Sequence, residues 1–129
     1  MKLICLVLGI LTLLVTASAQ KAKKAPDIEV LEAKAHRGED KISLDGRVKV
    51  SGEKPLKGLI LAFDFLSSSG DVLTTQKQEI SDDTLDRNEE APFHSELLNP
   101  PGAIKFRIRA FDASERELRS ANAGPFTIE

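Results

Sequence analysis

The chain has 129 residues, of which 41% are hydrophobic, and a formal net charge of −2. This length fits one domain. The slightly acidic balance argues against a nucleic-acid-binding protein, because such proteins usually carry a basic face.

Residues 1–19 have the form of a secretion signal. Lys2 gives a positive start, residues 3–15 are an apolar run, and the small residues at 17–19 suit signal peptidase cleavage before Gln20. A spanning helix needs roughly 20 apolar residues, so an uncleaved membrane anchor is the weaker alternative. A lipoprotein is not expected, because the only cysteine, Cys5, lies inside the apolar run.

Cleavage there would release a protein with no cysteine, which excludes a disulfide, a zinc–thiolate site and a thiol nucleophile. We expect an exported protein, periplasmic or secreted, with no stable membrane insertion after cleavage. Residues 20–26 contain three lysines and are expected to form a flexible lead-in. Residues 27–129 would then form the folded domain.

The folded part begins with a strand near 28–36, followed by strands at 42–50 and 59–66. The apolar parity of the first strand shifts after Val30, which predicts a β-bulge or a change of sheet. In 42–50, apolar and charged residues alternate, so one face is buried and the other is exposed to water. The alternate residues of 59–66 are only partly polar, which predicts a central strand covered on both faces.

Later strands are expected at 72–75, 93–97, 104–110 and 126–128. Clusters of Gly, Pro and Ser separate most of the strands and form turns. Pro125 places the last strand at a sheet edge. About seven short strands without helical periodicity predict an all-β fold, an Ig-like antiparallel β-sandwich.

Residues 45–111 resemble the FxLYD-type domain of bacterial and archaeal exported proteins. The resemblance lies in Gly46-Arg47-Val48-Lys49-Val50, Lys54-Pro55-Leu56-Lys57, Phe63-Asp64-Phe65-Leu66, Gly70-Asp71-Val72-Leu73 and Asn88-Glu89-Glu90-Ala91-Pro92-Phe93. Val50 replaces a usual Asn, and Phe65, Leu66 and Ser67 replace Leu, Tyr and Asp. The family is similar to Ig-like sandwiches and has no established enzymatic activity. The resemblance therefore implies a non-enzymatic binding or accessory module. We expect its partner to be a protein of the cell envelope.

The most acidic stretch, residues 81–90, is the weak candidate for a metal site. Its carboxylates belong to Asp82, Asp83, Asp86, Glu89 and Glu90. Oxygen ligands at this density suit Ca²⁺, but the spacing does not follow D-x-[DN]-x-[DN]-G and glycine is missing. We therefore expect a solvated loop between two strands and assign no metal or cofactor. The alternative function is a small-ligand or Ca²⁺-binding carrier that uses this loop.

The two histidines, His36 and His94, are expected to be exposed strand residues rather than catalytic bases. Ser, Asp and Glu are frequent in this chain, so a triad can be imagined, but no G-x-S-x-G motif supports one. An enzyme is therefore not expected.

A possible partner surface lies on the strand at 104–110. Lys105, Arg107 and Arg109 share one side of it, and Phe111 falls on the same side, whereas the other five Phe are in phase with apolar neighbours. Arg116 and Arg119 would extend the basic stripe if the last strands pair. The alternative is a solvated face that protects a sheet edge from aggregation.

Overall fold

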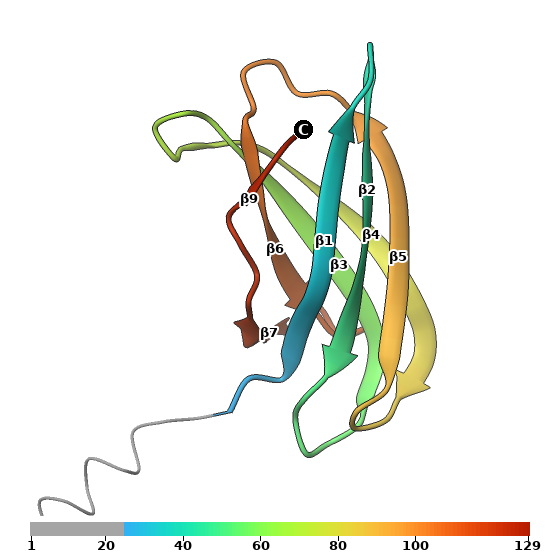
Figure 1. Cartoon of the computed structure of the whole chain (residues 1–129). Helices are drawn as coiled ribbons and strands as arrows, with labels where there is room; N and C mark the ends of the chain where they lie inside the picture. The colour runs from blue at the N-terminus through green and yellow to red at the C-terminus, as the bar shows by residue number, and fades with distance from the viewer. Residues whose placement is uncertain (1–24) are drawn as a thin grey trace, which may run out of the picture.

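The protein is a sandwich of two β-sheets, seen in a computed structural model that describes residues 25–129 (Figure 1). The predicted signal and residues 20–24 of the lead-in lie outside the described residues. The strands are β1 (Ile28–Arg37), β2 (Lys41–Val50), β3 (Leu56–Leu66), β4 (Val72–Leu85), β5 (Glu90–Leu98), β6 (Lys105–Phe111), β7 (Glu117–Leu118), β8 (Ser120–Ala121) and β9 (Phe126–Thr127). The all-β sandwich prediction is confirmed. No helix that could span a membrane occurs within residues 25–129.

One sheet has the strand order β5-β2-β1-β8 and the other β4-β3-β6-β7, with β9 also beside β6. Pairing is antiparallel except between β1 and β8. The strands β7 and β8 were not predicted, because elements of two residues are too short to show a period of two. The strand β9 pairs with β6, and the residues that follow it pair with β1 through a parallel bridge between Ile128 and Ala35. The Pro125 segment is thus flanked on both sides and is not the open sheet edge that was expected.

The predicted irregularity in β1 is a β-bulge. The β1–β2 register shifts between Val30 and Glu32, and the strand stays in its sheet. A Cβ atom at Gly46 in β2 would collide with the carbonyl oxygen of Glu32 and with the ring of Phe93. Glycine therefore lets the bulged strand and the Phe93 ring approach β2 closely.

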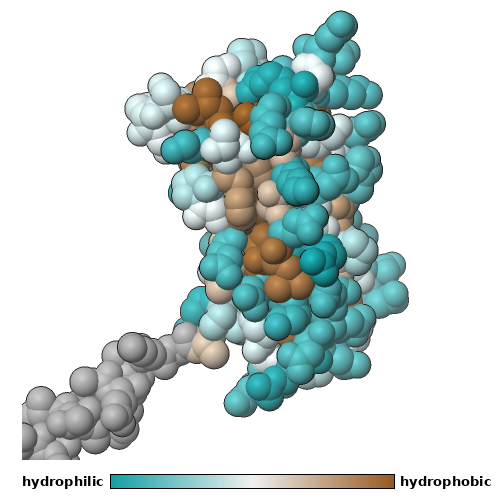
Figure 2. Space-filling view, viewed as in Figure 1, coloured by the Kyte–Doolittle hydropathy of each residue, from teal (hydrophilic) through white to brown (hydrophobic). Residues whose placement is uncertain are grey.

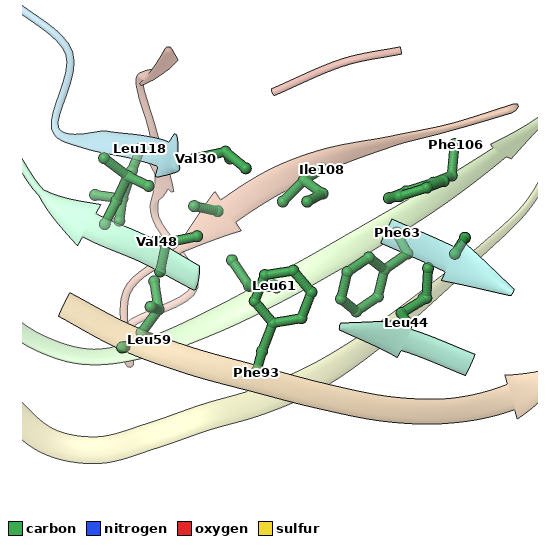
Figure 3. Packing of buried hydrophobic residues seen from close by; sticks show 14 of the residues in the cluster. Val30, Leu44, Val48, Leu59, Leu61, Phe63, Phe93, Phe106, Ile108 and Leu118 are labelled. Atoms are coloured by element: carbon green, nitrogen blue, oxygen red, sulfur yellow. The ribbon is translucent and has the colours of Figure 1, made fainter. Parts of the chain in front are cut away.

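The core lies between the two sheets and is built around three fully buried phenylalanines, Phe63, Phe65 and Phe106. Figure 3 shows Phe63 and Phe106 among the other buried side chains. The Phe63 and Phe93 rings, from opposite sheets, lie 5.7 Å apart between centroids. The strand β3 is covered on both faces, as predicted, since Ala62 and Asp64 on its outer side are also buried. A buried carboxylate in this position needs partners, and they define the candidate site.

Candidate functional site

The outer face of the sheet β4-β3-β6 carries a group of cations that we call the basic face. It consists of Lys77 from β4 and Lys105, Arg107 and Arg109 from β6. The register places Lys77 and Arg109 on either side of Ala62 in β3. These side chains point away from the core because the alternate residues of β3 and β6 point into it.

Asp64 is the centre of the basic face and is 1% exposed. Its carboxylate accepts hydrogen bonds from Thr75 Oγ1 at 2.6 Å, Arg107 Nε at 2.8 Å, and Arg109 Nε and Nη2 at 2.8 and 3.0 Å. Burial opposes ionisation, but the hydrogen bonds from Arg109, Thr75 and Arg107 outweigh it. The pKa of the Asp64 carboxyl therefore lies below its ordinary value, and Asp64 is an anion at neutral pH.

The hydrogen bonds to Asp64 hold two arginines in fixed positions at the surface. The side chains of Arg107 and Arg109 remain 44% and 34% exposed. Arg109 also has Nη1 at 3.8 Å from a carboxylate oxygen of Glu117 in β7. Since guanidinium groups are planar forks, fixing the Nε edge also fixes the direction in which the Nη groups point.

Sequence analysis named the arginines but missed the carboxylate that orients them. The pattern of residues 59–66 indicates only that Asp64 is a polar residue of a central strand. The signal was the single acidic residue inside the apolar run 59–66, followed by arginines at alternate positions of a later strand. Only the β3–β6 register, which sets Asp64 opposite Arg107, shows that they meet.

Phe111 lies on the basic face, as its parity predicts, but its ring is buried. The residue is only 8% exposed, because Lys77 Nζ lies 4.6 Å and Arg109 Cζ 5.6 Å from the ring centroid. Cations attract the electron-rich face of an aromatic ring, so the ring supports them from below. A partner on this face would meet the two cations rather than the phenylalanine.

The two arginines expected to extend the basic stripe have other positions. Arg116 forms an ion pair with Asp112, whose pKa is lowered chiefly by the backbone N–H of Arg116. Arg119 lies between β7 and β8, where the chain passes from one sheet to the other. The basic face therefore ends near β7 instead of continuing around the molecule.

The predicted acidic loop is wrong in its first half. Residues 81–85 are the end of β4, so Asp82 and Asp83 are exposed residues of an edge strand, and Leu85 is buried opposite Leu56. Only residues 86–89 form a turn, in which Asp86 N–H donates to Glu89 Oε1. Glu90 begins β5. Nowhere in residues 25–129 do three or more His, Cys, Asp or Glu side chains gather closely enough to hold a metal ion.

The outer face of the sheet β5-β2-β1 is called the charged face here. It carries five carboxylates and four Lys or Arg side chains, from Glu29, Glu32, Asp45, Glu90, Glu96, Lys34, Lys41, Arg47 and Lys49. Cross-strand ion pairs join Arg47 to Glu90 at 2.7 Å and Lys49 to Glu29 at 3.7 Å. These pairs are partly or fully exposed, and neighbouring charges on this face largely cancel each other.

Both histidines lie on the charged face. His94 is hydrogen-bonded to Asp45, which raises the pKa of His94 above its ordinary value. His36 lies opposite Ser43 and lines a hollow of about 120 Å³ that Ser43 and Asp45 also line. Among the hydrogen bonds of residues 25–129, none joins Ser43 to His36, so these residues are not arranged as a nucleophile and its base.

An apolar area lies at the end of the sandwich that holds the β3–β4 turn. Its exposed side chains are Val72, Leu73, Leu98 and Ile104, and Leu98 is 72% exposed. Leu98 also lines a groove of about 390 Å³ with Thr74, Gln76, Asn99, Pro100 and Pro101. Figure 2 shows hydrophobic surface beside the β3–β4 turn and a second hydrophobic patch in the lower half of the domain, whereas most of this side of the molecule is hydrophilic. Sequence analysis did not identify this area.

Comparison with known proteins gives only distant structural likenesses. No family model and no curated protein matches the chain. A Bacteroides uniformis β-glucuronidase is 18% identical, with a TM-score of 0.44, over 70% of this chain and 12% of the glucuronidase. IrmA from Escherichia coli is 13% identical, with a TM-score of 0.44, over 79% of this chain and 95% of IrmA. A Kluyveromyces marxianus β-glucosidase is 17% identical, with a TM-score of 0.40, over 81% of this chain and 14% of the glucosidase. The chain thus spans about a seventh or less of either glycosidase, and the likeness to FxLYD-type domains remains a prediction.

Proposed function

We propose that this chain is a non-enzymatic binding or accessory module that contacts a protein of the cell envelope through its basic face. The observation that carries the proposal is the buried Asp64, which holds Arg107 and Arg109 at the surface of a rigid sheet. Side chains that are already ordered lose little conformational entropy when a partner binds. The pair is therefore better suited to recognition than flexible surface cations.

The proposal includes an Ig-like form of the sandwich and export of the protein. The strands β5-β2-β1-β8 face β4-β3-β6-β7, and the chain crosses between the sheets after β2, β4 and β5, as Ig-like connections do, and again on both sides of the short strand β8. Export is supported by the signal-like residues 1–19, and the accessory role by the resemblance to FxLYD-type domains.

Site-specific photo-crosslinking in the native cell envelope tests this function. A photoreactive residue replaces Lys105 on the basic face, Lys34 on the charged face, or Leu98 in the apolar area. We expect one abundant crosslinked envelope protein from position 105 and none from position 34. Crosslinking confined to position 98 would move the contact to the apolar area and refute the basic face as the partner surface.

Charge reversal gives a second measurement on the intact protein. Lys105→Glu leaves the Asp64 hydrogen bonds in place, because Lys105 does not contact that carboxylate. It should reduce recovery of the crosslinked partner from a photoreactive residue at position 77. Lys34→Glu is the matched control and should not change it. Equal recovery from both variants would contradict the proposal.

A further inference from the structure

We infer that the basic face binds an extended acidic segment of its partner, with carboxylates at alternate residues of that segment. The inference rests on the proposed function and specifies the chemistry of the partner. Three observations support it: the spacing of the cations along β6, the open edge of Arg107, and the balance of charge between the two outer faces of the sandwich.

The first observation is the regular spacing of Lys105, Arg107 and Arg109. They occupy alternate positions of one strand, so successive side chains emerge about 6.6–6.8 Å apart on the same face. Alternate side chains of any extended peptide have this same spacing. Carboxylates two residues apart can therefore lie opposite Lys105 and Arg107, whereas consecutive carboxylates point to opposite sides of the peptide. Arg109 is drawn toward Asp64 and Glu117 and adds positive charge beside Lys105 and Arg107.

The second observation is the way in which Asp64 binds Arg107. The carboxylate accepts one hydrogen bond from Arg107, from Nε at 2.8 Å. It accepts two from Arg109, from Nε and from Nη2. Within residues 25–129, no other hydrogen bond or ion pair involves the Arg107 side chain. Its two Nη groups therefore form an open fork of the shape that accepts a carboxylate with two parallel hydrogen bonds.

The third observation is the sign of the surface charge. At its surface, the outer side of β4-β3-β6-β7 presents the four cations of the basic face and two carboxylates, Glu79 and Glu117. On the charged face of the other sheet, carboxylates exceed Lys and Arg side chains by only one. An acidic segment is thus attracted to the basic face, whereas the charges of the other outer face nearly cancel and offer it no comparable attraction.

Calorimetric titration of residues 20–129 with two peptides of identical composition tests the inference. One peptide contains Glu-Ser-Glu-Ser-Glu and the other Glu-Glu-Glu-Ser-Ser. At low ionic strength we expect the alternating peptide to bind roughly threefold more tightly, the effect of about one additional exposed ion pair. Equal affinity of the two peptides would overturn the inference. So would binding of a sulfated polysaccharide in place of either peptide.

Three variants locate the binding, and two of them, Lys105→Gln and Lys34→Gln, leave the hydrogen bonds to Asp64 in place. Lys105→Gln should weaken the alternating peptide roughly threefold, whereas Lys34→Gln on the charged face should not change its affinity. Arg107→Lys keeps the charge but removes the fork, and should abolish the preference for the alternating peptide. Chemical-shift changes of the Arg107 and Arg109 Nε–H signals report contact at this face directly. Peptide binding without shifts at either signal would refute the inference.

The outcomes separate this inference from the proposed function. If position 105 crosslinks to an envelope protein but neither peptide binds, the inference of an acidic segment is wrong, and the basic face remains the partner surface. If position 105 gives no crosslink but the alternating peptide binds with the expected variants, the chemistry of the face is right and the envelope partner is wrong.

Discussion

The two outer faces of the sandwich carry charge in different ways. On the charged face, Arg47, Lys49 and their neighbours form cross-strand pairs whose side chains are 32–47% exposed. On the basic face, one carboxylate, Asp64, is 1% exposed and binds two arginines. The two sheets thus use similar residue types, but only one of them buries a charge.

This difference has energetic consequences. An exposed ion pair contributes about 0–1 kcal/mol, because water and salt screen it. Removal of one partner from a buried pair costs far more, roughly 3–5 kcal/mol, because the remaining charge lacks compensation. We therefore expect substitutions on the charged face to change stability little, and substitutions at Asp64 to change it strongly.

Phe63→Ala sets the upper end of the scale, because Phe63 precedes Asp64 in β3 but faces the core. It should lower the free energy of unfolding by about 3–5 kcal/mol, since loss of a buried ring leaves a cavity. Urea denaturation of the variant measures this directly. A nearly silent substitution would mean that the inner and outer sides of β3 are reversed.

Asp64→Ala should have the next largest effect, about 2–4 kcal/mol, somewhat below the cost for a fully buried pair because both arginines remain partly exposed. Asp45→Ala, on the charged face, is the matched control and should cost less than about 1 kcal/mol. Urea denaturation of both variants tests the comparison. Equal losses of unfolding free energy would show that the Asp64 carboxylate stabilises the fold no more than an exposed carboxylate of the charged face.

Gly46→Ala tests whether the stability of the sheet that carries the charged face depends on the packing of its inner side. The added Cβ would meet the Glu32 carbonyl oxygen and the Phe93 ring, so we expect a loss of about 1–3 kcal/mol, as in other overpacked sites. Arg47→Ala changes the next residue, whose side chain is on the outer side, and should cost less than about 1 kcal/mol. Thermal unfolding of both variants measures the difference, and a larger loss for Arg47→Ala would reverse our conclusion.

The pH dependence of stability should also differ between the two faces, because Asp64 on the basic face and His94 on the charged face titrate in different pH ranges. The folded-state pKa of Asp64 is lowered, so its stabilisation is present above the ordinary value of 3.8 and is lost as pH falls through the folded pKa. The pKa of His94 is raised, so its pairing with Asp45 stabilises below 6.5 and is lost as pH rises through the folded pKa. We expect a steeper loss of stability in acid for the wild type than for Asp64→Asn. His94→Gln should remove a weak stabilisation that the wild type has below pH 6.5, and the two proteins should become equally stable above the folded pKa of His94; the effect is small because the pair is exposed.

The smallest effect is expected at the turn between β4 and β5. Asp86→Ala should stay within about ±0.5 kcal/mol, because this exposed residue uses its backbone rather than its carboxylate in the turn hydrogen bonds. Thermal unfolding with and without millimolar Ca²⁺ checks both stability and the carrier alternative. A large loss, or a shift of the melting temperature with Ca²⁺, would point to an ion held by the acidic residues.

Much of the sandwich could be predicted from local patterns. The alternation in 42–50, the two-sided burial of 59–66 and the bulge after Val30 were all visible, because side-chain parity in a strand depends only on the pleat. The length of β4, which runs from Val72 to Leu85, could not be predicted from the sequence. As an edge strand it exposes most residues on both sides, so residues 76–85 show no clear alternation and the sequence predicts a loop from residue 81 onward.

For the candidate site, the sequence by itself determined which cations share a side of β6 and that Phe111 lies with them. Only the tertiary structure decided that Asp64 and Thr75 meet Arg107 and Arg109, and that Phe111 lies under Lys77. The physical reason is the range of the interactions. Parity follows from neighbouring residues, whereas cross-strand contacts depend on a register set by residues more than 40 positions apart in the case of Asp64 and its arginines.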